Sequence, residues 1–461
     1  MGLFPYADRF PVARTLPDVG RDRADVLAEI EDMSEREDAS YHEGKISGSI
    51  YSGDEDHYAF LNEVFGRYSH ANVLQRDMYP SATRFEGEII AMTADLLHGG
   101  AAGGSVCGVL TSGGTESLMN PLLVYREWGR ERGITTPNVV LPVTAHPALD
   151  KGAHYFGIEL RKATVTDAFV ADMSSVESLV DESTVALVGS AGTYPHGLID
   201  PIDALSALAL ERGINLHVDG CLGGFILAFG ADAGDDVPPF DFRLPGVTSI
   251  SADTHKYGFA LKGSSVLLYR SPELRRLQYF LVADWPGGLY TSPGMSGSRS
   301  GGIIAAAWAS MVTLGRSGYT AIAADIFRTA RELRGVIARH PELRVLGDPL
   351  FNVAFSHVEG GDVDIFHVND AMSEQGWRLN GLQLPPAVHF CVTRPNTKPG
   401  VVDRFADDLA AAVAHAKERV GTAPRSGATY GAAGAQVPRE AVESAMAGWL
   451  DATQSLPPLS P

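Results

Sequence analysis

Short runs of β-branched and aliphatic residues alternate with helical stretches between about residues 51 and 315. Five of these runs are the right length for strands, and they are residues 139–142, 184–189, 214–219, 247–252 and 265–269. Helical patterns lie between them at residues 118–132, 173–180 and 204–212. Strands that alternate with helices are typical of a mostly parallel sheet covered on both faces. The pattern therefore predicts an α/β domain.

The pattern changes on either side of this region. Residues 1–60 are polar and mixed in charge, with one helical pattern near 21–37, so we expect an N-terminal arm. The 461 residues are too many for one hydrophobic core. We therefore predict a large domain at 61–315 and a smaller α+β domain at 316–461. The elements expected in the smaller domain are helices near 319–340, 366–376 and 439–453 and strands near 343–345, 353–355 and 388–393.

Composition and charge exclude several classes of protein. A net charge of −19 argues against a nucleic-acid partner, because a protein that binds the phosphate backbone needs a basic face. No apolar run is long enough to cross a membrane, and the first residues do not resemble a secretory signal. Three cysteines in apolar or glycine-rich surroundings indicate a reducing compartment. We expect a cytoplasmic protein with no membrane span and no metal site.

Three features, in this order along the chain, are typical of a site for pyridoxal 5'-phosphate (PLP). The glycine turn TSGGTES (111–117) precedes a helix, whose N-terminus can bind the cofactor phosphate. Asp219 ends the strand 214–219, and its carboxylate can pair with the pyridinium nitrogen. Lys256, in ISADTHKYG (250–258), can supply the amine for a Schiff base. Taken singly, the three features could be an ordinary turn, a helix-capping or surface acid and a surface lysine. Their combination favours a PLP site.

Three further residues were considered near these features. His146 follows a predicted strand, where it can be a structural histidine or can stack on the cofactor ring, and both roles are open. His217 lies on the same strand face as Asp219, and we expect it to pack in the core. Pro121 removes a backbone hydrogen bond early in the helix after the glycine turn, so we expect a local kink.

Longer motifs also lie along the chain, and they are GKISGSIYSGD (44–54), GVLTSGGTESL (108–118), YPHGLIDPI (194–202), LHVDGCLGGF (216–225), FRLPGVTSISADTHKYGFALKGSSVLLYR (242–270), DWPGGLYTSPGMSGSRSGG (284–302) and LPPAVHFCVT (384–393). Together these motifs resemble the sphingosine-1-phosphate lyase family over roughly residues 24–455. The resemblance implies a homodimeric fold-type-I PLP enzyme of the group II decarboxylase branch, with a mostly parallel seven-stranded sheet. The implied reaction is retro-aldol cleavage of a phosphorylated long-chain base into a fatty aldehyde and phosphoethanolamine.

The resemblance also implies roles for individual residues. Lys256 is similar to the Schiff-base lysine, Asp219 to the pyridinium partner and His146 to the residue over the cofactor ring. The residues that resemble ligands of the cofactor phosphate are Gly114, Thr115, Ser251 and His255, with Gly297 and Ser298 supplied by the partner subunit. The residues that resemble the set for binding the substrate phosphate or assisting proton transfer are Tyr51, Asn72, Gln75, Tyr194 and Lys262.

Three positions depart from the family pattern. Gln75 stands where a histidine is usual, Phe259 where a tyrosine is common, and Leu261 where a proline or a small residue is common. Gln75 lacks the charge that a histidine can carry, which leaves phosphate affinity and substrate choice open. The alternatives to this lyase are an amino-acid decarboxylase of the same branch, a lyase for a shorter phosphorylated β-hydroxy amine, and a binding protein without catalysis.

Overall fold

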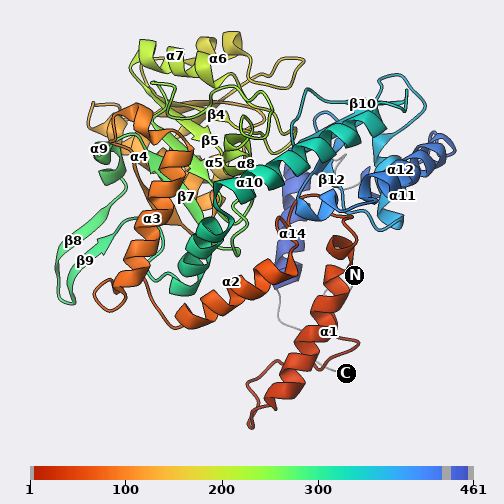
Figure 1. The fold of residues 1–461 in the computed structure, drawn as a ribbon. Coiled ribbons are helices and arrows are strands. Elements are labelled where there is room, and N and C mark those ends of the chain that lie inside the picture. The colour runs from red at the N-terminus through yellow and green to blue at the C-terminus, as the bar shows by residue number, and fades with distance from the viewer. Residues whose placement is uncertain (1–4, 428–437, 455–461) are drawn as a thin grey trace.

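The computed structural model describes residues 5–427 and 438–454 and shows a large domain, a smaller domain and a projecting N-terminal arm (Figure 1). A long helix, α10 (Gly301–Ile337), runs from the large domain to the smaller one. Element labels are those of Figure 1. The outermost ends of the predicted arm and small domain, at 1–4 and 455–461, lie outside the described residues, as does the segment 428–437.

A seven-stranded sheet forms the centre of the large domain, in the order β1-β7-β6-β5-β4-β2-β3. The pairings from β6 through β5, β4 and β2 to β3 are parallel, whereas β7 is antiparallel to both of its neighbours. The predicted mostly parallel seven-stranded sheet is therefore confirmed. The strands are β1 (Cys107–Thr111), β2 (Asn138–Pro142), β3 (Glu159–Ala163), β4 (Thr184–Ser190), β5 (Asn215–Asp219), β6 (Ser249–Ala252) and β7 (Ser265–Tyr269).

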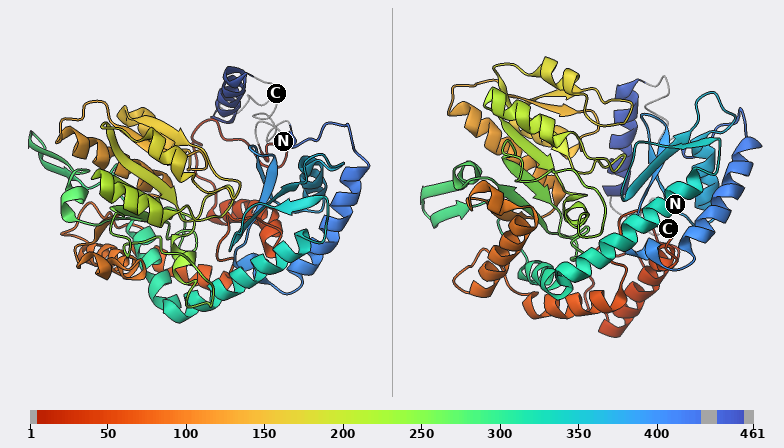
Figure 2. Two further views of the ribbon diagram at one scale, coloured as in Figure 1. Left: turned by 90° about the horizontal axis from the view of Figure 1, so that it is seen from above. Right: turned by 45° about the horizontal axis from the view of Figure 1, so that its top comes forward.

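Helices cover both faces of this sheet because its central strands are apolar on both sides (Figure 2). In β2, Val139 and Leu141 belong to one buried cluster and Val140 to the cluster on the other face, as the alternation of side chains along a strand requires. One face carries α4 (Gly114–Arg130), α5 (Ala148–Phe156) and α9 (Pro272–Arg276). The other carries α3 (Pro80–Leu96), α6 (Met173–Leu179), α7 (Ile202–Arg212) and α8 (Gly224–Ala228), with a 3-10 turn at Gly99–Ala102.

The smaller domain is built on an antiparallel sheet in the order β10-β11-β13-β12. This agrees with the predicted α+β character. Gly315 (φ 58°) interrupts α10, and the predicted domain boundaries stay predictions. The remaining elements are β10 (Leu343–Val345), β11 (Asn352–His357), α11 (Ile365–Glu374), β12 (Asn380–Leu382), β13 (Ala387–Cys391), a 3-10 turn (Arg394–Thr397) and α12 (Val401–Lys417).

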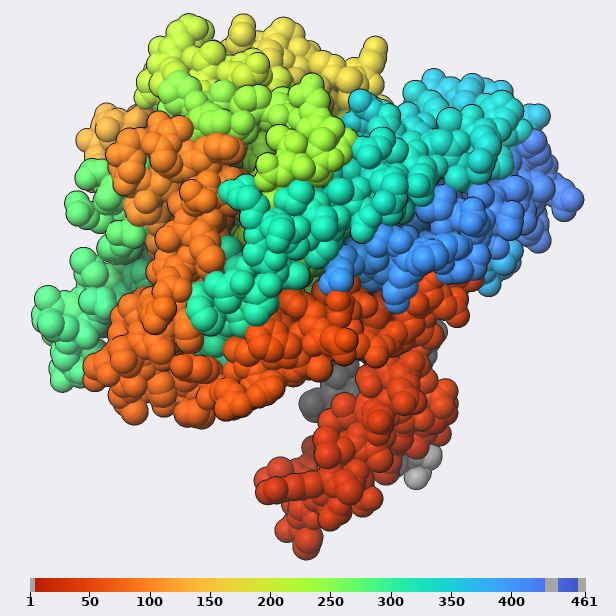
Figure 3. Space-filling view, in the orientation of Figure 1, coloured from red at the N-terminus to blue at the C-terminus, as the bar shows by residue number. Residues whose placement is uncertain are grey.

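Several elements stand away from this body and leave apolar surface exposed. Helix α1 (Arg23–His42) has no buried residue and projects from the molecule (Figure 3). Helix α14 (Arg439–Gln454) also has none, and the hairpin of β8 (Phe280–Trp285) and β9 (Gly288–Ser292) is almost wholly exposed. Helix α2 (Glu55–Tyr68) instead packs on α10. None of the helices in the described ranges is long and apolar enough to cross a membrane.

Candidate active site

The carboxyl ends of three neighbouring parallel strands carry the centre of the candidate site. Ser190 of β4, Asp219 of β5 and Ser251 of β6 are partners in register across the sheet. Because parallel strands run in one direction, these residues reach the same edge of the sheet, which is where ligands bind in α/β folds. The turn that carries Lys256 begins directly after β6 at this edge.

Asp219 is buried and held by its neighbours. Its Oδ1 accepts a hydrogen bond from the backbone N–H of Cys221 at 3.0 Å and lies 3.4 Å from the hydroxyl of Ser251. The Ser251 hydroxyl also lies 3.4 Å from His217 Nε2, and His217 Nδ1 is 2.7 Å from the Ser249 hydroxyl. Burial lowers the pKa of His217 to about 4, so this ring is neutral and supports Asp219 from inside the core.

The start of α4 forms an anion-binding corner opposite Asp219. No side chain caps this helix at Gly113, so its first N–H groups are left for another partner. A Cβ added at Gly114 would lie 2.7 Å from Asp253 Oδ2 and 3.1 Å from Cys221 Sγ, so only glycine fits there. The His255 ring lies beside Gly113, and its Nδ1 is buried without a hydrogen-bond partner among the described residues.

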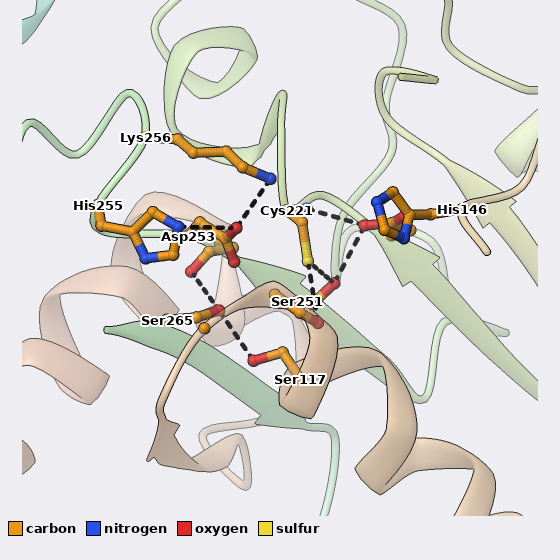
Figure 4. Close-up of polar contacts among 12 residues, drawn as sticks. Ser117, His146, Cys221, Ser251, Asp253, His255, Lys256 and Ser265 are labelled. Carbon is orange, nitrogen blue, oxygen red and sulfur yellow. Dashed lines mark hydrogen bonds and ion pairs between the residues drawn. The ribbon is translucent and has the colours of Figure 1, made fainter. Parts of the chain in front are cut away.

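Lys256 is paired with a buried carboxylate three residues before it. Its Nζ lies 2.8 Å from Asp253 Oδ2, and Asp253 is only 1 % exposed (Figure 4). His255 Nε2 is 3.6 Å from the same oxygen. Burial by itself lowers the pKa of Lys256, but the charge of Asp253 outweighs it and the pKa lies above the ordinary value. The lysine amine is thus held as an ammonium.

His146 and Tyr194 lie on another side of this space. His146 is fixed by the backbone N–H of Ala148, which donates to its Nδ1 at 3.1 Å. The ring of Tyr194 meets that of His146 edge-on with 6.3 Å between centroids, and it packs against His389 of the smaller domain at 5.0 Å. Asn352, also in the smaller domain, donates to the backbone oxygen of Tyr194 at 2.8 Å. The smaller domain therefore holds Tyr194 in position.

Lys262 supplies a second cation close to Lys256. Its Nζ lies 4.7 Å from the centre of the Tyr51 ring and donates to the backbone oxygen of His255 at 3.3 Å. Desolvation, followed by the nearby charge of Lys256, lowers the pKa of Lys262 to about 8. Tyr51 is buried, and its pKa is raised chiefly by burial, so its hydroxyl stays neutral. The two lysines and Tyr51 thus face one region.

Four of the predicted site residues lie together, and one of them, Ser298, lines a pocket with Thr111 and Ser112 of the glycine turn. Asn72 donates from Nδ2 to the hydroxyl of Ser298 at 2.9 Å, and its backbone oxygen accepts from Gln75 N–H. Gln75, Gly297 and Ser298 are exposed. Among the described residues, no hydrogen bond or ion pair joins these four to Lys256 or Asp219. Glu116 in the first turn of α4 instead anchors the loop before Gly297, accepting the N–H of Met295 at 3.1 Å.

The sequence analysis missed two buried residues that shape the site. Asp253 was treated only as a neighbour of Lys256, although a spacing of three residues lets a carboxylate and an amine meet in one turn of chain. His389 lies in β13 and meets Tyr194 only through the tertiary fold. The Asp253 contact could have been found from local spacing, whereas that of His389 could not.

These features fit pyridoxal phosphate. The uncapped α4 start and the unpaired Nδ1 of His255 match a phosphate, and the buried carboxylate of Asp219 matches a pyridinium nitrogen. Lys256 offers the amine. The Ser251 hydroxyl contacts Asp219, His217 and Cys221, so it supports the carboxylate, and its predicted role toward the phosphate stays a prediction. Fold and site define a PLP-dependent enzyme.

Comparisons with known proteins identify the class and then the family. The model of the pyridoxal-dependent decarboxylase conserved domain matches residues 21–358. Sphingosine-1-phosphate lyase 1 of Rattus norvegicus is 40% identical over 97% of this chain and 78% of its own length. A solved sphingosine-1-phosphate lyase of Burkholderia pseudomallei is 48% identical, with a TM-score of 0.92 over 98% of this chain and 100% of that one. The chain belongs to the sphingosine-1-phosphate lyase family of pyridoxal-dependent enzymes.

A more distant structure shows the shared fold alone. Glutamate decarboxylase of Lactobacillus brevis is 20% identical, with a TM-score of 0.78 over 89% of this chain and 97% of that one. The family membership and the fold predicted from the motifs are confirmed. The roles of the individual site residues stay predictions.

Asp219→Asn should weaken cofactor retention and lower turnover, because a neutral amide cannot hold a pyridinium proton by charge. Losing such a contact costs about 2–4 kcal/mol, or roughly 30- to 1000-fold in rate. Dialysis against buffer without PLP and measurement of kcat test both effects. Asp241→Asn is the matched control, because Asp241 is also a buried carboxylate and pairs with Arg243 and His98 elsewhere. Activity of Asp219→Asn within twofold of wild type would refute the assignment.

Proposed function

We propose that this enzyme cleaves a phosphorylated long-chain base, such as sphinganine 1-phosphate, into a long-chain aldehyde and phosphoethanolamine. The observation that carries the proposal is that a second cation, Lys262, lies close to Lys256 at the PLP site. The chain as a whole has a net charge of −19. A substrate phosphate needs such a local cation, because the protein as a whole repels anions. The names of the relatives support the same substrate class.

The site residues divide the work of this reaction among them. When bound, PLP supplies an electron sink for the carbanion that Cα–Cβ cleavage leaves behind. Asp219 would hold the ring nitrogen protonated, the α4 N-terminus and His255 would hold the phosphate, and His146 would cover the ring. Cleavage also needs a base for the substrate's β-hydroxyl proton and an acid that returns a proton to carbon. Tyr194 and Lys262 are the groups that we assign to this proton transfer or to the substrate phosphate.

Wild-type enzyme should cleave the phosphorylated base far faster than the free base, because a site built around a phosphate leaves cations unpaired without it. Each unpaired group costs about 1–3 kcal/mol. The measurement is kcat/KM for sphinganine and sphinganine 1-phosphate at pH 7, with aldehyde and carbon dioxide both quantified. The preference should decline above pH 8, since the free-enzyme pKa of Lys262 is about 8 and its charge is lost there.

Variants make this test specific. Lys262→Ala should reduce the difference in kcat/KM between the two bases, because it impairs cleavage of the phosphorylated base alone. Lys262→Arg should keep the preference for the phosphorylated base and remove the decline of that preference above pH 8. Gln75→His should leave the preference intact or strengthen it. Equal kcat/KM for both bases would contradict the phosphate site. Release of carbon dioxide instead of aldehyde would establish the decarboxylase, and cleavage of only short phosphorylated amines would establish the third alternative.

We infer a homodimer in which each subunit lends a loop to its partner's site. Gly297 and Ser298 are exposed, and Asn72 and Gln75 lie with them on the same surface. The neighbouring hairpin exposes apolar side chains, with Trp285 56% and Leu289 82% exposed, as a subunit interface would. This arrangement supports placing all four residues in the partner's site. The cytoplasm as location stays a prediction from the three free cysteines.

Two variants that fail separately should work as a mixture if sites are shared. Lys256→Ala removes the amine from its own site, whereas Ser298→Asp places a negative charge beside the partner's phosphate site. A hybrid dimer then contains one site with neither change, so mixing should restore activity toward one quarter of the wild-type value at equal input. Native mass spectrometry verifies subunit exchange. Exchange without recovered activity, or a monomer in solution, would rule out shared sites.

A further inference from the structure

Asp253 is the one negatively charged group in contact with the Lys256 amine among the described residues. Its Oδ2 lies 2.8 Å from Lys256 Nζ, and the carboxylate also accepts a hydrogen bond from the Ser265 hydroxyl (Figure 4). The other aspartate of the site, Asp219, is engaged by the Cys221 N–H and the Ser251 hydroxyl. A buried carboxylate stays charged only when a cation balances it, and Lys256 is the nearest cation. The two groups therefore form one unit.

The other groups around Lys256 do not supply a negative charge. The other side chains that interact electrostatically with the Lys256 amine are Tyr51, Cys221, His255, Lys262 and Cys391. Burial raises the pKa values of Tyr51 and Cys221 well above neutrality and that of Cys391 to about 11, so all three are neutral. Lys262 is a cation. Burial lowers the pKa of His255 despite Asp253, so this ring adds no anion either.

We propose that Asp253 is a positioning residue that keeps the Lys256 nitrogen an ammonium whenever that nitrogen is not bonded to the cofactor. The lysine is free in each turnover, because the amine of a substrate takes its place on the cofactor. The Asp253 carboxylate then fixes the direction of the free Lys256 side chain and keeps the lone pair of the Lys256 nitrogen occupied by a proton. Gly114 is part of this arrangement, since any larger residue there would displace Asp253.

This role has a consequence for an enzyme that produces an aldehyde, and this part rests on the proposed function. A lysine forms an imine only as the neutral amine. The ammonium first releases one proton to solvent, the freed lone pair then attacks the carbonyl carbon, and the carbonyl oxygen leaves as water with the two remaining N–H protons. An ammonium paired with Asp253 cannot attack. The pairing therefore protects Lys256 from the aldehyde product while the lysine is free, at the expense of slower reaction with the cofactor.

The test measures how fast the Lys256 amine of the full-length protein reacts with pyridoxal after its cofactor has been removed. Pyridoxal lacks the phosphate, so charge effects on phosphate binding do not enter, and no substrate is used. Borohydride trapping at timed intervals, followed by mass spectrometry of peptides that separate Lys256 from Lys262, gives the rate at Lys256 alone from pH 6 to 9. Wild type should show a rate that rises about tenfold per pH unit over the whole range, because the neutral fraction of an amine of raised pKa rises in that way.

Asp253→Asn should react at least about tenfold faster at pH 7 and should level off within the range, since burial then lowers the amine pKa unopposed. Asp253→Glu, which keeps the charge, should restore much of the wild-type slope. Asp241→Asn, which removes an equally buried and ion-paired carboxylate from another loop, should react as wild type does. Treatment with a long-chain aldehyde and borohydride should modify Lys256 mainly in Asp253→Asn.

Two outcomes would overturn the proposal. One is a wild-type rate of imine formation at Lys256 that reaches a plateau below pH 8. This outcome can be observed without any variant, so it applies even if Asp253→Asn does not fold. The other is an Asp253→Asn rate and pH profile equal to those of wild type. Failure of the substrate tests alone would leave the pyridoxal results standing, so the two proposals are separable.

Discussion

The parallel pairing of β4, β5 and β6 is the constraint on which the rest of the site depends. Register across these strands sets Ser190, Asp219 and Ser251 side by side, and the chain leaving β6 turns at once into the segment that bears Lys256. A slip of one residue in β5 would turn Asp219 to the other face of the sheet. The carboxylate for the ring nitrogen and the amine for the cofactor are therefore positioned by backbone pairing rather than by flexible loops.

Charge at this edge is arranged locally and against the overall charge of the molecule. A chain with a net charge of −19 repels an anionic substrate at long range, but salt screens that repulsion beyond about 8 Å. Inside that distance, Lys256, Lys262 and the N-terminus of α4 act together. Asp253 balances the first of these, so Lys262 is the cation left for a substrate.

Much of the fold could be predicted because the central strands are apolar and short. The predicted strands 139–142, 184–189, 214–219 and 265–269 agree with β2, β4, β5 and β7 within one residue at either end. The edge strand β3 was missed because ELRKA is mostly polar and lies at the edge of the sheet, and the exposed hairpin of β8 and β9 was missed for want of a buried face. Helix α4 continues past Pro121 to Arg130, and the expected kink there stays a prediction.

The site was predictable to the extent that its chemistry is local in the chain. Lys256, Asp219 and the glycine turn were found from strand ends and spacing. The support of Tyr194 by His389 and Asn352 was not, because these residues are more than 150 positions from it and come together only when the two domains pack. The grouping of Asn72 with Ser298, 226 positions apart, was hidden for the same reason.

The central claim is that geometry, and not intrinsic reactivity, selects the lysine that carries the cofactor. Lys262 has a pKa of about 8 and is the more reactive free amine near neutral pH, whereas Lys256 is held as an ammonium by Asp253. Borohydride reduction of the enzyme with its bound cofactor, followed by mass spectrometry of peptides that separate the two lysines, decides between them. The account predicts a pyridoxyl group on Lys256, and a label on Lys262 would contradict it.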